Sequence, residues 1–230
     1  DSMIAYFNGR FLPEEDIRIS PEDRGFVFAD ALYEVIRTYE GRLFETQAHW
    51  ARLSYGANAL RFNRTGFNDL TEVAETLLRE NGLTQGDATV YVQVTRGQAP
   101  RSHPFPPQET PLTIYASARP FFLKGFATDG VSVILVSDQR WARCDIKTVG
   151  LTANVLAQQQ AQDHGAHEAL FVRDGAVLEG TRTNLFTVFD GTVVTPPRTN
   201  YILGCITRQV ILGLCKKLSI PAVESPVFES

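Results

Sequence analysis

Four dipeptides that end in glycine lie between short runs of alternating apolar and polar residues. They are Asn8-Gly9, Glu40-Gly41, Asp174-Gly175 and Asp190-Gly191. Such pairs favour two-residue turns between antiparallel strands, because both turn residues adopt a positive φ that glycine, asparagine and aspartate tolerate. Each stretch around one of these pairs is therefore predicted to be a β-hairpin, and hairpins occur in both halves of the chain.

Helical segments are predicted between these hairpins from apolar residues at helical spacing. The helical segments are 46–62, 67–82, 152–165 and 206–220. Single strands are predicted at 88–97, 111–120 and 131–137. The proline-rich stretch "QAPRSHPFPP" at 98–107 is predicted to be a loop, because proline lacks the N–H that regular structure needs. This mixture predicts an α/β chain of the α+β type.

A two-domain organisation is expected, with "RPFFLKG" at 119–125 as the connector. Residues 1–118 then form an N-terminal α+β domain, and residues 126–230 form a C-terminal domain. Ligand sites favour the crevice between two domains.

Composition narrows the class of protein. The 230 residues carry a net charge of −4, and the basic residues are scattered, which argues against nucleic acid as a partner. The three cysteines form no C-x-x-C pair, as is typical of a protein in the reducing cytoplasm. The apolar runs are too short to span a membrane, and no metal is expected.

Lys147 in "CDIKTVGLTANVLA" is the first candidate for chemistry, because it is a single lysine inside a run of otherwise mostly apolar or small residues. A desolvated lysine has a lowered pKa and is a nucleophilic amine that forms Schiff bases. The alternative is a surface lysine that reaches solvent at a helix entry, which is the commoner case for a single lysine.

Three further sites become informative only together with Lys147. Glu179 ends a strand beside residues that donate hydrogen bonds. The segment after Gly204 begins a helix, and the free N–H groups of a helix start can bind a phosphate. Arg52 can bind a phosphate as a bidentate donor. Each has an ordinary structural explanation when taken alone. Jointly they supply an amine, a carboxylate and a phosphate site, which is the set that pyridoxal 5′-phosphate needs.

Five stretches make the chain similar to the class IV (fold type IV) pyridoxal-phosphate-dependent aminotransferases, closest to the D-amino acid transaminase branch. They are "RGFVFADALYEVIRTYEGRLFETQAHWARL", "YVQVTRGQAPRSHPFPP", "RWARCDIKTVGLTANVLAQQQA", "VLEGTRTNLF" and "YILGCITRQVI". The resemblance covers nearly the whole chain. It implies a small N-terminal α+β domain and a larger C-terminal domain of pseudo-barrel form.

The resemblance assigns the cofactor residues one by one. Lys147 matches the Schiff-base lysine, and Glu179 matches the glutamate at the pyridine nitrogen. The remaining matches are residues beside the cofactor ring or its phosphate: Arg52, Thr183, Leu203, Ile206 and Thr207.

The resemblance also implies a substrate site. Tyr33, Arg101 and His103 match the residues that bind the substrate carboxylate in the D-specific branch, where the arginine and the histidine come from the partner subunit. A cytoplasmic homodimer that transfers amino groups between D-amino acids, such as D-alanine, and 2-oxo acids is therefore expected.

The chain departs from the family pattern at two places. Arg182 stands where a small hydroxyl residue often contacts the phosphate, and family members continue beyond "VESPVFES", so the second domain is expected to be incomplete. Four alternatives stay open: a branched-chain L-amino acid aminotransferase, an (R)-amine transaminase, an aminodeoxychorismate lyase, and a truncated protein that binds pyridoxal phosphate without turnover. The stretch "RSH" at 101–103 favours the D-amino acid enzyme over the other enzymes.

Overall fold

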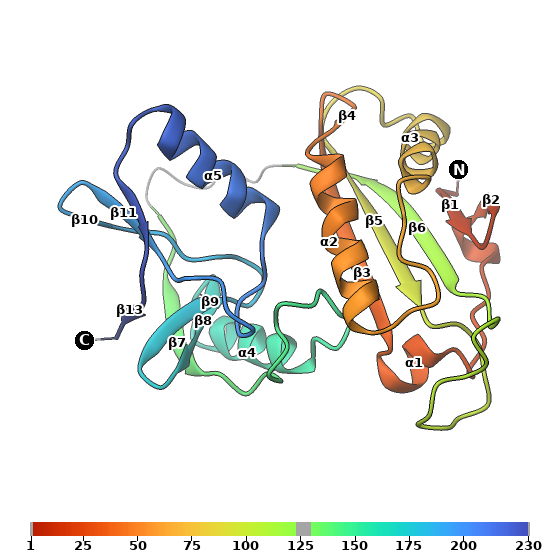
Figure 1. Cartoon of the computed structure of the whole chain (residues 1–230). Coiled ribbons are helices and arrows are strands. Elements are labelled where there is room, and N and C mark those ends of the chain that lie inside the picture. The colour runs from red at the N-terminus through yellow and green to blue at the C-terminus, as the bar shows by residue number, and fades with distance from the viewer. Residues whose placement is uncertain (1, 123–129, 230) are drawn as a thin grey trace. The chain divides into compact units, whose positions relative to one another are not determined.

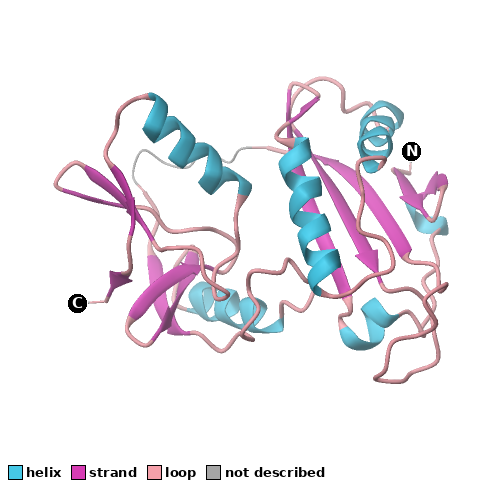
Figure 2. Ribbon diagram, in the orientation of Figure 1, coloured by secondary structure: helices cyan, strands magenta, loops and turns pink. Residues whose placement is uncertain are grey.

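The computed structural model describes residues 2–122 and 130–229, and they form two compact units (Figure 1). The first unit is Asp1–Leu123 with Ile146–Gly150, and the second is Lys124–Asp145 with Leu151–Ser230. Both units combine helices with strands, as Figure 2 shows by colour. The predicted α/β class is confirmed.

A six-stranded antiparallel sheet in the order β2-β1-β6-β5-β3-β4 is the centre of the first unit. Its strands are β1 Ile4–Phe7, β2 Arg10–Pro13, β3 Ala31–Tyr39, β4 Arg42–Leu43, β5 Ala88–Thr95 and β6 Thr113–Pro120. The helical segments of this unit are η1 Glu14–Asp16, α1 Arg24–Phe28, α2 Thr46–Ala59 and α3 Leu70–Glu80.

Helices α2 and α3 cover one face of this sheet (Figure 1). Strand residues alternate between the two faces, so Val90, Val92 and Val94 of β5 are buried in one apolar core with Trp50 of α2 and Leu77 of α3. Burying these side chains is the main favourable contribution to folding of the unit.

Three rings line the opposite face, on the strands β3, β5 and β6. The Tyr33 and Tyr91 ring centroids are 5.7 Å apart, and those of Tyr91 and Tyr115 are 6.3 Å apart. The sheet therefore has an apolar face beneath the helices and a second face that carries tyrosine side chains.

The second unit contains two smaller sheets. One has the order β13-β9-β8-β7 and the other β10-β11-β12. The elements are β7 Val133–Ser137, α4 Thr152–Asp163, β8 Glu168–Arg173, β9 Ala176–Gly180, β10 Thr187–Phe189, β11 Thr192–Thr195, α5 Ile206–Lys217, β12 Ala222–Glu224 and β13 Val227–Phe228. Helix α4 connects the parallel strands β7 and β8 and packs on them through Ala157 and Ala161.

All four predicted hairpins are present, and both residues of each turn have a positive φ. The predicted helices also form, and each ends two or three residues before its predicted limit, at Ala59, Glu80, Asp163 and Lys217. The helix predicted to reach residue 62 ends at Ala59, and Arg61 has a φ of 57°. The last helix ends at Lys217, before Ser219, whose φ is 55°.

The predicted domain limits, 1–118, 119–125 and 126–230, differ from the two units at one important place. Residues Ile146–Gly150 group with the first unit, although the prediction assigns them to the C-terminal domain. Residues 123–125 of the predicted connector lie outside the described residues. Among the helices that the structure describes, none has the length and apolar character needed to cross a membrane.

Candidate active site

Lys147 lies on a short extended segment that pairs with the start of β3. The Tyr33 N–H donates to the Lys147 carbonyl at 3.1 Å, and the Val149 N–H donates to the Ala31 carbonyl at 3.2 Å. This pairing brings the Lys147 Nζ atom to 4.2 Å from the centroid of the Tyr33 ring. Lys147 is half-buried, so the predicted apolar setting is present in part: Ile146 belongs to the core, while the amine lies against a ring.

Tyr33 is a neutral hydrogen-bonding group in this setting. Burial raises the pKa of its phenol, and the nearby charge of Arg52 opposes that shift. The hydroxyl therefore stays protonated at neutral pH and is able to donate a hydrogen bond.

Arg52 is oriented by a carboxylate that is fully buried beneath α2. Its Nε and Nη2 atoms donate to the two oxygens of Glu34 at 2.7 and 2.6 Å, and His49 contacts the same carboxylate at 2.7 Å. Burial alone would raise the pKa of Glu34, but the hydrogen bonds from Arg52 and His49 outweigh it, and the pKa is lowered. A fixed guanidinium of this kind is suited to bind an anion.

Arg101 and His103 are exposed on the proline-rich loop of the first unit. Both lie on the ring of Phe28: the Arg101 guanidinium carbon is 5.3 Å from the ring centroid, and the His103 ring centroid is 5.6 Å from it. The structure therefore brings these two predicted residues together on one ring, as a pair of basic side chains open to solvent.

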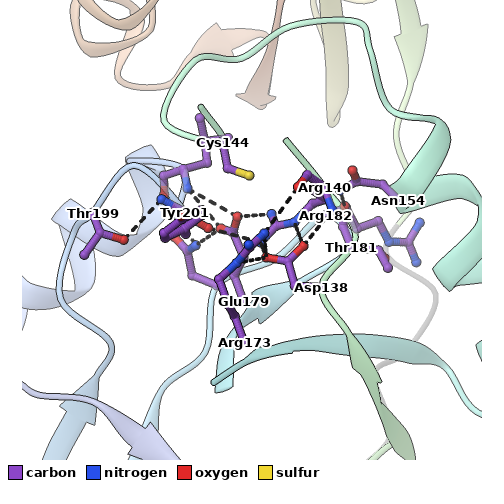
Figure 3. A network of polar contacts seen from close by, with 12 residues as sticks. Asp138, Arg140, Cys144, Asn154, Arg173, Glu179, Thr181, Arg182, Thr199 and Tyr201 are labelled. Atoms are coloured by element: carbon purple, nitrogen blue, oxygen red, sulfur yellow. Dashed lines mark hydrogen bonds and ion pairs between the residues drawn. The ribbon is translucent and has the colours of Figure 1, made fainter. Parts of the chain in front are cut away.

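Glu179, at the end of β9, is the centre of a polar cluster in the second unit (Figure 3). Its Oε1 atom accepts from Arg140 at 2.5 Å, and its Oε2 atom accepts from Asn184 at 2.9 Å and from the Leu203 N–H at 3.1 Å. Arg140 is held in turn by Asp138, whose side chain is fully buried. The carboxylate is thus fixed by three donors from separate parts of the chain.

The charge state of Glu179 is set by opposing effects. Burial raises the pKa of its carboxyl to about 7, although the charge of Arg140 and the hydrogen bonds oppose the shift. Near neutral pH such a group changes protonation with small changes in its surroundings, and a bound cation would favour the ionised form.

Helix α5 begins directly after this cluster. Its N-cap residue, Cys205, makes no side-chain cap hydrogen bond, so the first turn of a 12-residue helix lacks the oxygen acceptor that usually serves there. Ile206 is buried and Thr207 is exposed at this helix start. The N-terminus of a helix attracts anions through its N–H groups and its dipole.

A turn at residues 181–183 follows β9 and is held by Glu168. The Glu168 carboxylate accepts from the hydroxyls of Thr181 and Thr183 and from the Arg182 N–H, at 3.1, 2.9 and 3.0 Å. The Arg182 and Thr183 residues are exposed. The hydroxyl of Thr183, which is predicted to bind the cofactor, is thus bonded to Glu168 here.

The predicted residues therefore form two groups, one in each unit. Tyr33, Arg52 and Lys147 lie on or beside β3, and the loop with Arg101 and His103 belongs to the same unit. The second unit holds the others, which are Glu179, Thr183, Leu203, Ile206 and Thr207.

The donors and acceptors in these groups suit pyridoxal 5′-phosphate. In the second unit, Glu179 offers a buried carboxylate to a ring cation, and the start of α5 offers N–H donors to an anion. In the first unit, Arg52 offers a guanidinium. Asn184 Oδ1, beside Glu179, is buried and has no hydrogen-bond partner among the described residues. A buried unpartnered acceptor of this kind is rare in folded proteins and fits a ligand that supplies a donor.

Sequence reasoning missed the residues that hold the site together. Arg140 and Asp138 stand close in "SDQRWARC", and an acid two residues before a base was a visible signal of an ion pair. Nothing in a single sequence indicates that Arg140 meets Glu179, 39 residues away along the chain. Glu34 is a further buried acid. The sequence alone does not indicate that this residue of β3 faces His49 and Arg52 of α2.

Known proteins match this chain along almost its whole length. The profile of the family "Amino-transferase class IV" matches residues 31–228. The D-alanine aminotransferase of Staphylococcus epidermidis is 40% identical over 228 residues, which are 96% of this chain and 78% of that protein. The D-alanine aminotransferase of Bacillus licheniformis is 38% identical over 230 residues, which cover 98% of this chain and 79% of that one.

Solved structures agree on the fold. The branched-chain amino acid aminotransferase of Escherichia coli matches with a TM-score of 0.89 at 24% identity, over 100% of this chain and 79% of that chain. The branched-chain aminotransferase of the thermophilic archaeon Thermoproteus uzoniensis, solved with norvaline, matches with a TM-score of 0.87 at 24% identity, over 100% of this chain and 80% of that chain. With the family profile and the identities to the two D-alanine aminotransferases, the chain belongs to the class IV aminotransferases.

Proposed function

We propose that this chain is a pyridoxal-phosphate-dependent aminotransferase that transfers amino groups between D-amino acids, such as D-alanine, and 2-oxo acids. The observation that carries the proposal is the position of Lys147. Backbone pairing with β3 fixes the lysine and leaves its amine beside Tyr33, 4.2 Å from the ring, where a substrate that Tyr33 binds would meet it.

Lys147 supplies the base of the reaction in this proposal. Pyridoxal phosphate, when bound, supplies the carbonyl that takes the amino group and an electron sink for the bond that breaks. The Lys147 amine removes the proton from the substrate α-carbon and later returns a proton, as a general acid–base. The amino donor leaves as a 2-oxo acid, and a second 2-oxo acid receives the amino group.

The other proposed cofactor residues bind and orient. The Glu179 carboxylate holds a proton at the pyridine nitrogen, since an ionised acid beside a ring cation stabilises it. Arg52, which Glu34 holds in place, is the guanidinium assigned to the phosphate. The remaining members of the set contact the phosphate or the ring: Thr183, Leu203, Ile206 and Thr207.

The substrate carboxylate is assigned to Tyr33, Arg101 and His103. A carboxylate docked on an arginine forms charge-assisted hydrogen bonds that fix its direction. The direction in turn decides which enantiomer presents its α-hydrogen to the lysine. Relatives named D-alanine aminotransferase support the choice of D-amino acids.

A homodimer and a cytoplasmic location complete the proposal. The exposed loop with Arg101 and His103 suits a residue pair that serves the site of a second copy. The three cysteines, Cys144, Cys205 and Cys215, are free, which fits a reducing compartment.

The test is a panel of amino donors added to the purified protein with pyridoxal phosphate. The cofactor absorbance should change with D-alanine and much less with L-alanine, L-leucine or a simple (R)-amine. A change with L-leucine or the (R)-amine alone would assign the chain to one of those two branches. Bound cofactor whose spectrum no donor alters would indicate binding without turnover.

Borohydride reduction tests the lysine separately. Reduction should leave the cofactor on the peptide that contains Lys147, and a Lys147→Arg variant should carry none. Cofactor fixed on a different peptide would remove Lys147 from its proposed role.

A further inference from the structure

The loop that carries Arg101 and His103 is bound along its backbone by one buried arginine. The Arg24 Nη1 atom donates to the Ser102 carbonyl at 2.6 Å and lies 3.4 Å from the Pro104 carbonyl, and its Nη2 atom lies 3.4 Å from the His103 carbonyl. Three consecutive carbonyls therefore converge on a single guanidinium. Arginine is suited to this task because its donors form a rigid planar fork.

Arg24 is itself fixed in place. It is 4% exposed, its Nε atom donates to Asp30 at 3.0 Å, and its guanidinium carbon is 4.8 Å from the centroid of the Phe28 ring. Its backbone N–H donates to the Gly97 carbonyl at 2.9 Å. A side chain held by these contacts is already ordered, so it loses little conformational entropy when the loop binds a ligand.

The Phe28 ring also contacts two side chains of the loop, those of Arg101 and His103. Phe28 lies under Arg24 and under the exposed side chains of Arg101 and His103, at 5.3 and 5.6 Å. The short helix α1 thus presents both the donor for the loop backbone and the surface for the loop side chains.

Asp30 does not depend on Arg24 for its charge balance. Arg96 donates to both Asp30 oxygens, at 2.6 and 3.0 Å, and also to the Leu60 carbonyl at 2.8 Å. Removing the Arg24 guanidinium therefore leaves the Asp30 carboxylate paired, and the main loss is that of the contacts to the loop.

We infer that Arg24 is a positioning residue that sets the affinity of the site for the substrate carboxylate, by holding the backbone of residues 102–104 so that Arg101 and His103 stay in their binding arrangement. This inference rests on the proposed function, because it takes Arg101 and His103 as the carboxylate receptor. A receptor that is already ordered loses less conformational freedom on binding, and a displacement of about 1 Å in a positioning group costs up to about a hundredfold.

The experiment compares Arg24→Gln and Arg24→Lys with the matched control Arg37→Gln, in the full chain loaded with pyridoxal phosphate. Arg37 of β3 also pairs with an acid, Asp87 at 2.5 Å, and also lies over a ring, that of Tyr39 at 4.7 Å. Calorimetry measures the binding of propanoate, a carboxylate without an amino group. Steady-state rates with D-alanine give KM and kcat separately.

Arg24→Gln should weaken propanoate binding and raise the KM for D-alanine by about tenfold or more, with kcat changed by less than about threefold. Arg24→Lys keeps the charge opposite Asp30 but offers a single ammonium in place of the fork, so it should show a smaller loss in the same direction. Arg37→Gln should leave both constants unchanged.

Unchanged propanoate affinity in Arg24→Lys and Arg24→Gln would overturn the inference, and so would an equal loss in Arg37→Gln. If Arg24→Gln does not fold, Arg24→Lys decides. Failure of the proposed function has a different signature, namely a wild-type protein that binds propanoate but does not turn over D-alanine. A wild type that binds no propanoate would overturn the carboxylate receptor and the role of Arg24 together.

Discussion

Replacing Glu179 by glutamine removes a charge from the interior of the second unit and keeps the size of the side chain. Burial raises the pKa of the Glu179 carboxyl from 4.5 to about 7, against the opposing charge of Arg140. An acid whose pKa rises on folding stays protonated in the folded protein where the unfolded chain has already ionised. Between about pH 4.5 and pH 7 the unfolded chain loses this proton and the folded protein keeps it. The free energy of unfolding therefore falls as the pH rises through this range.

The two pKa values give the magnitude. The difference between 4.5 and about 7 corresponds to about 3.5 kcal/mol, at about 1.4 kcal/mol per pKa unit. Without cofactor, Glu179→Gln should thus be more stable than the wild type at pH 8, by up to about 3.5 kcal/mol, and equally stable below pH 4.5. If Glu179 has its proposed role, transamination by the same variant should fall severely, because glutamine carries no charge that would hold a proton at the pyridine nitrogen.

The assay is urea unfolding of the cofactor-free protein at several pH values. The chain has two tryptophans, Trp50 in the first unit and Trp141 in the second. A Trp50→Phe background leaves Trp141 as the fluorescent reporter of the second unit, for Glu179→Gln, and a Trp141→Phe background leaves Trp50 as the reporter of the first unit, for the control Glu34→Gln.

Glu34→Gln is the control of opposite sign. Burial raises the pKa of Glu34, but the hydrogen bonds from Arg52 and His49 lower it further than burial raises it. Its ionised form therefore stabilises the fold above its ordinary pKa, and that contribution disappears as the pH falls. Glu34→Gln should be less stable than the wild type at pH 8. A Glu179→Gln protein that is less stable than the wild type at pH 8, or a difference that does not change between pH 5 and pH 8, would refute the reasoning.

Three further outcomes are expected. Lys147→Ala should abolish transamination and leave the thermal unfolding temperature within a few degrees of the wild-type value. Turnover near the wild-type rate would contradict the assignment of Lys147 as the base. Arg101→Ala should raise the KM for D-alanine by an amount equivalent to about 2–5 kcal/mol with little change in cofactor affinity, as fluorescence titration would measure; a normal KM would exclude the carboxylate contact. Gly97→Ala should destabilise by at least ~2 kcal/mol, because Gly97 has a φ of 94° and an added Cβ would lie 2.0 Å from the Pro111 carbonyl oxygen. Its control, Gly213→Ala in α5, adds a Cβ that meets no described atom within 4 Å and should stabilise by up to about 1 kcal/mol; equal effects of the two in urea unfolding would argue against the steric explanation.

The hairpins were predictable because their turns are decided by two adjacent residues. At Asp174 and Asp190, for example, the positive φ that glycine and aspartate tolerate is a local property. Lys147 and Glu179 were identified as candidates by residue type and resemblance. Their partners were not, because the contacts of Arg140 with Glu179 and of Arg24 with the loop at 102–104 join distant segments.

The helix that follows Gly204 begins where it was predicted, at Ile206, but the contact that fixes this start was not predicted. The cap position is Cys205, whose side chain makes no cap hydrogen bond. The position of a helix start depends on where the preceding chain is held. Here the Leu203 N–H is bonded to Glu179, a contact that no local pattern encodes.

The pairing of Ile146–Gly150 with β3 makes the order of synthesis matter. The strand partner of Ala31 and Tyr33 emerges from the ribosome more than a hundred residues after they do. A nascent chain that ends before residue 146 therefore leaves the first part of β3 with an open edge, which is prone to wrong pairing. The segment that closes this edge is also the one that carries Lys147, so a molecule in which this lysine is misplaced also exposes the edge of β3.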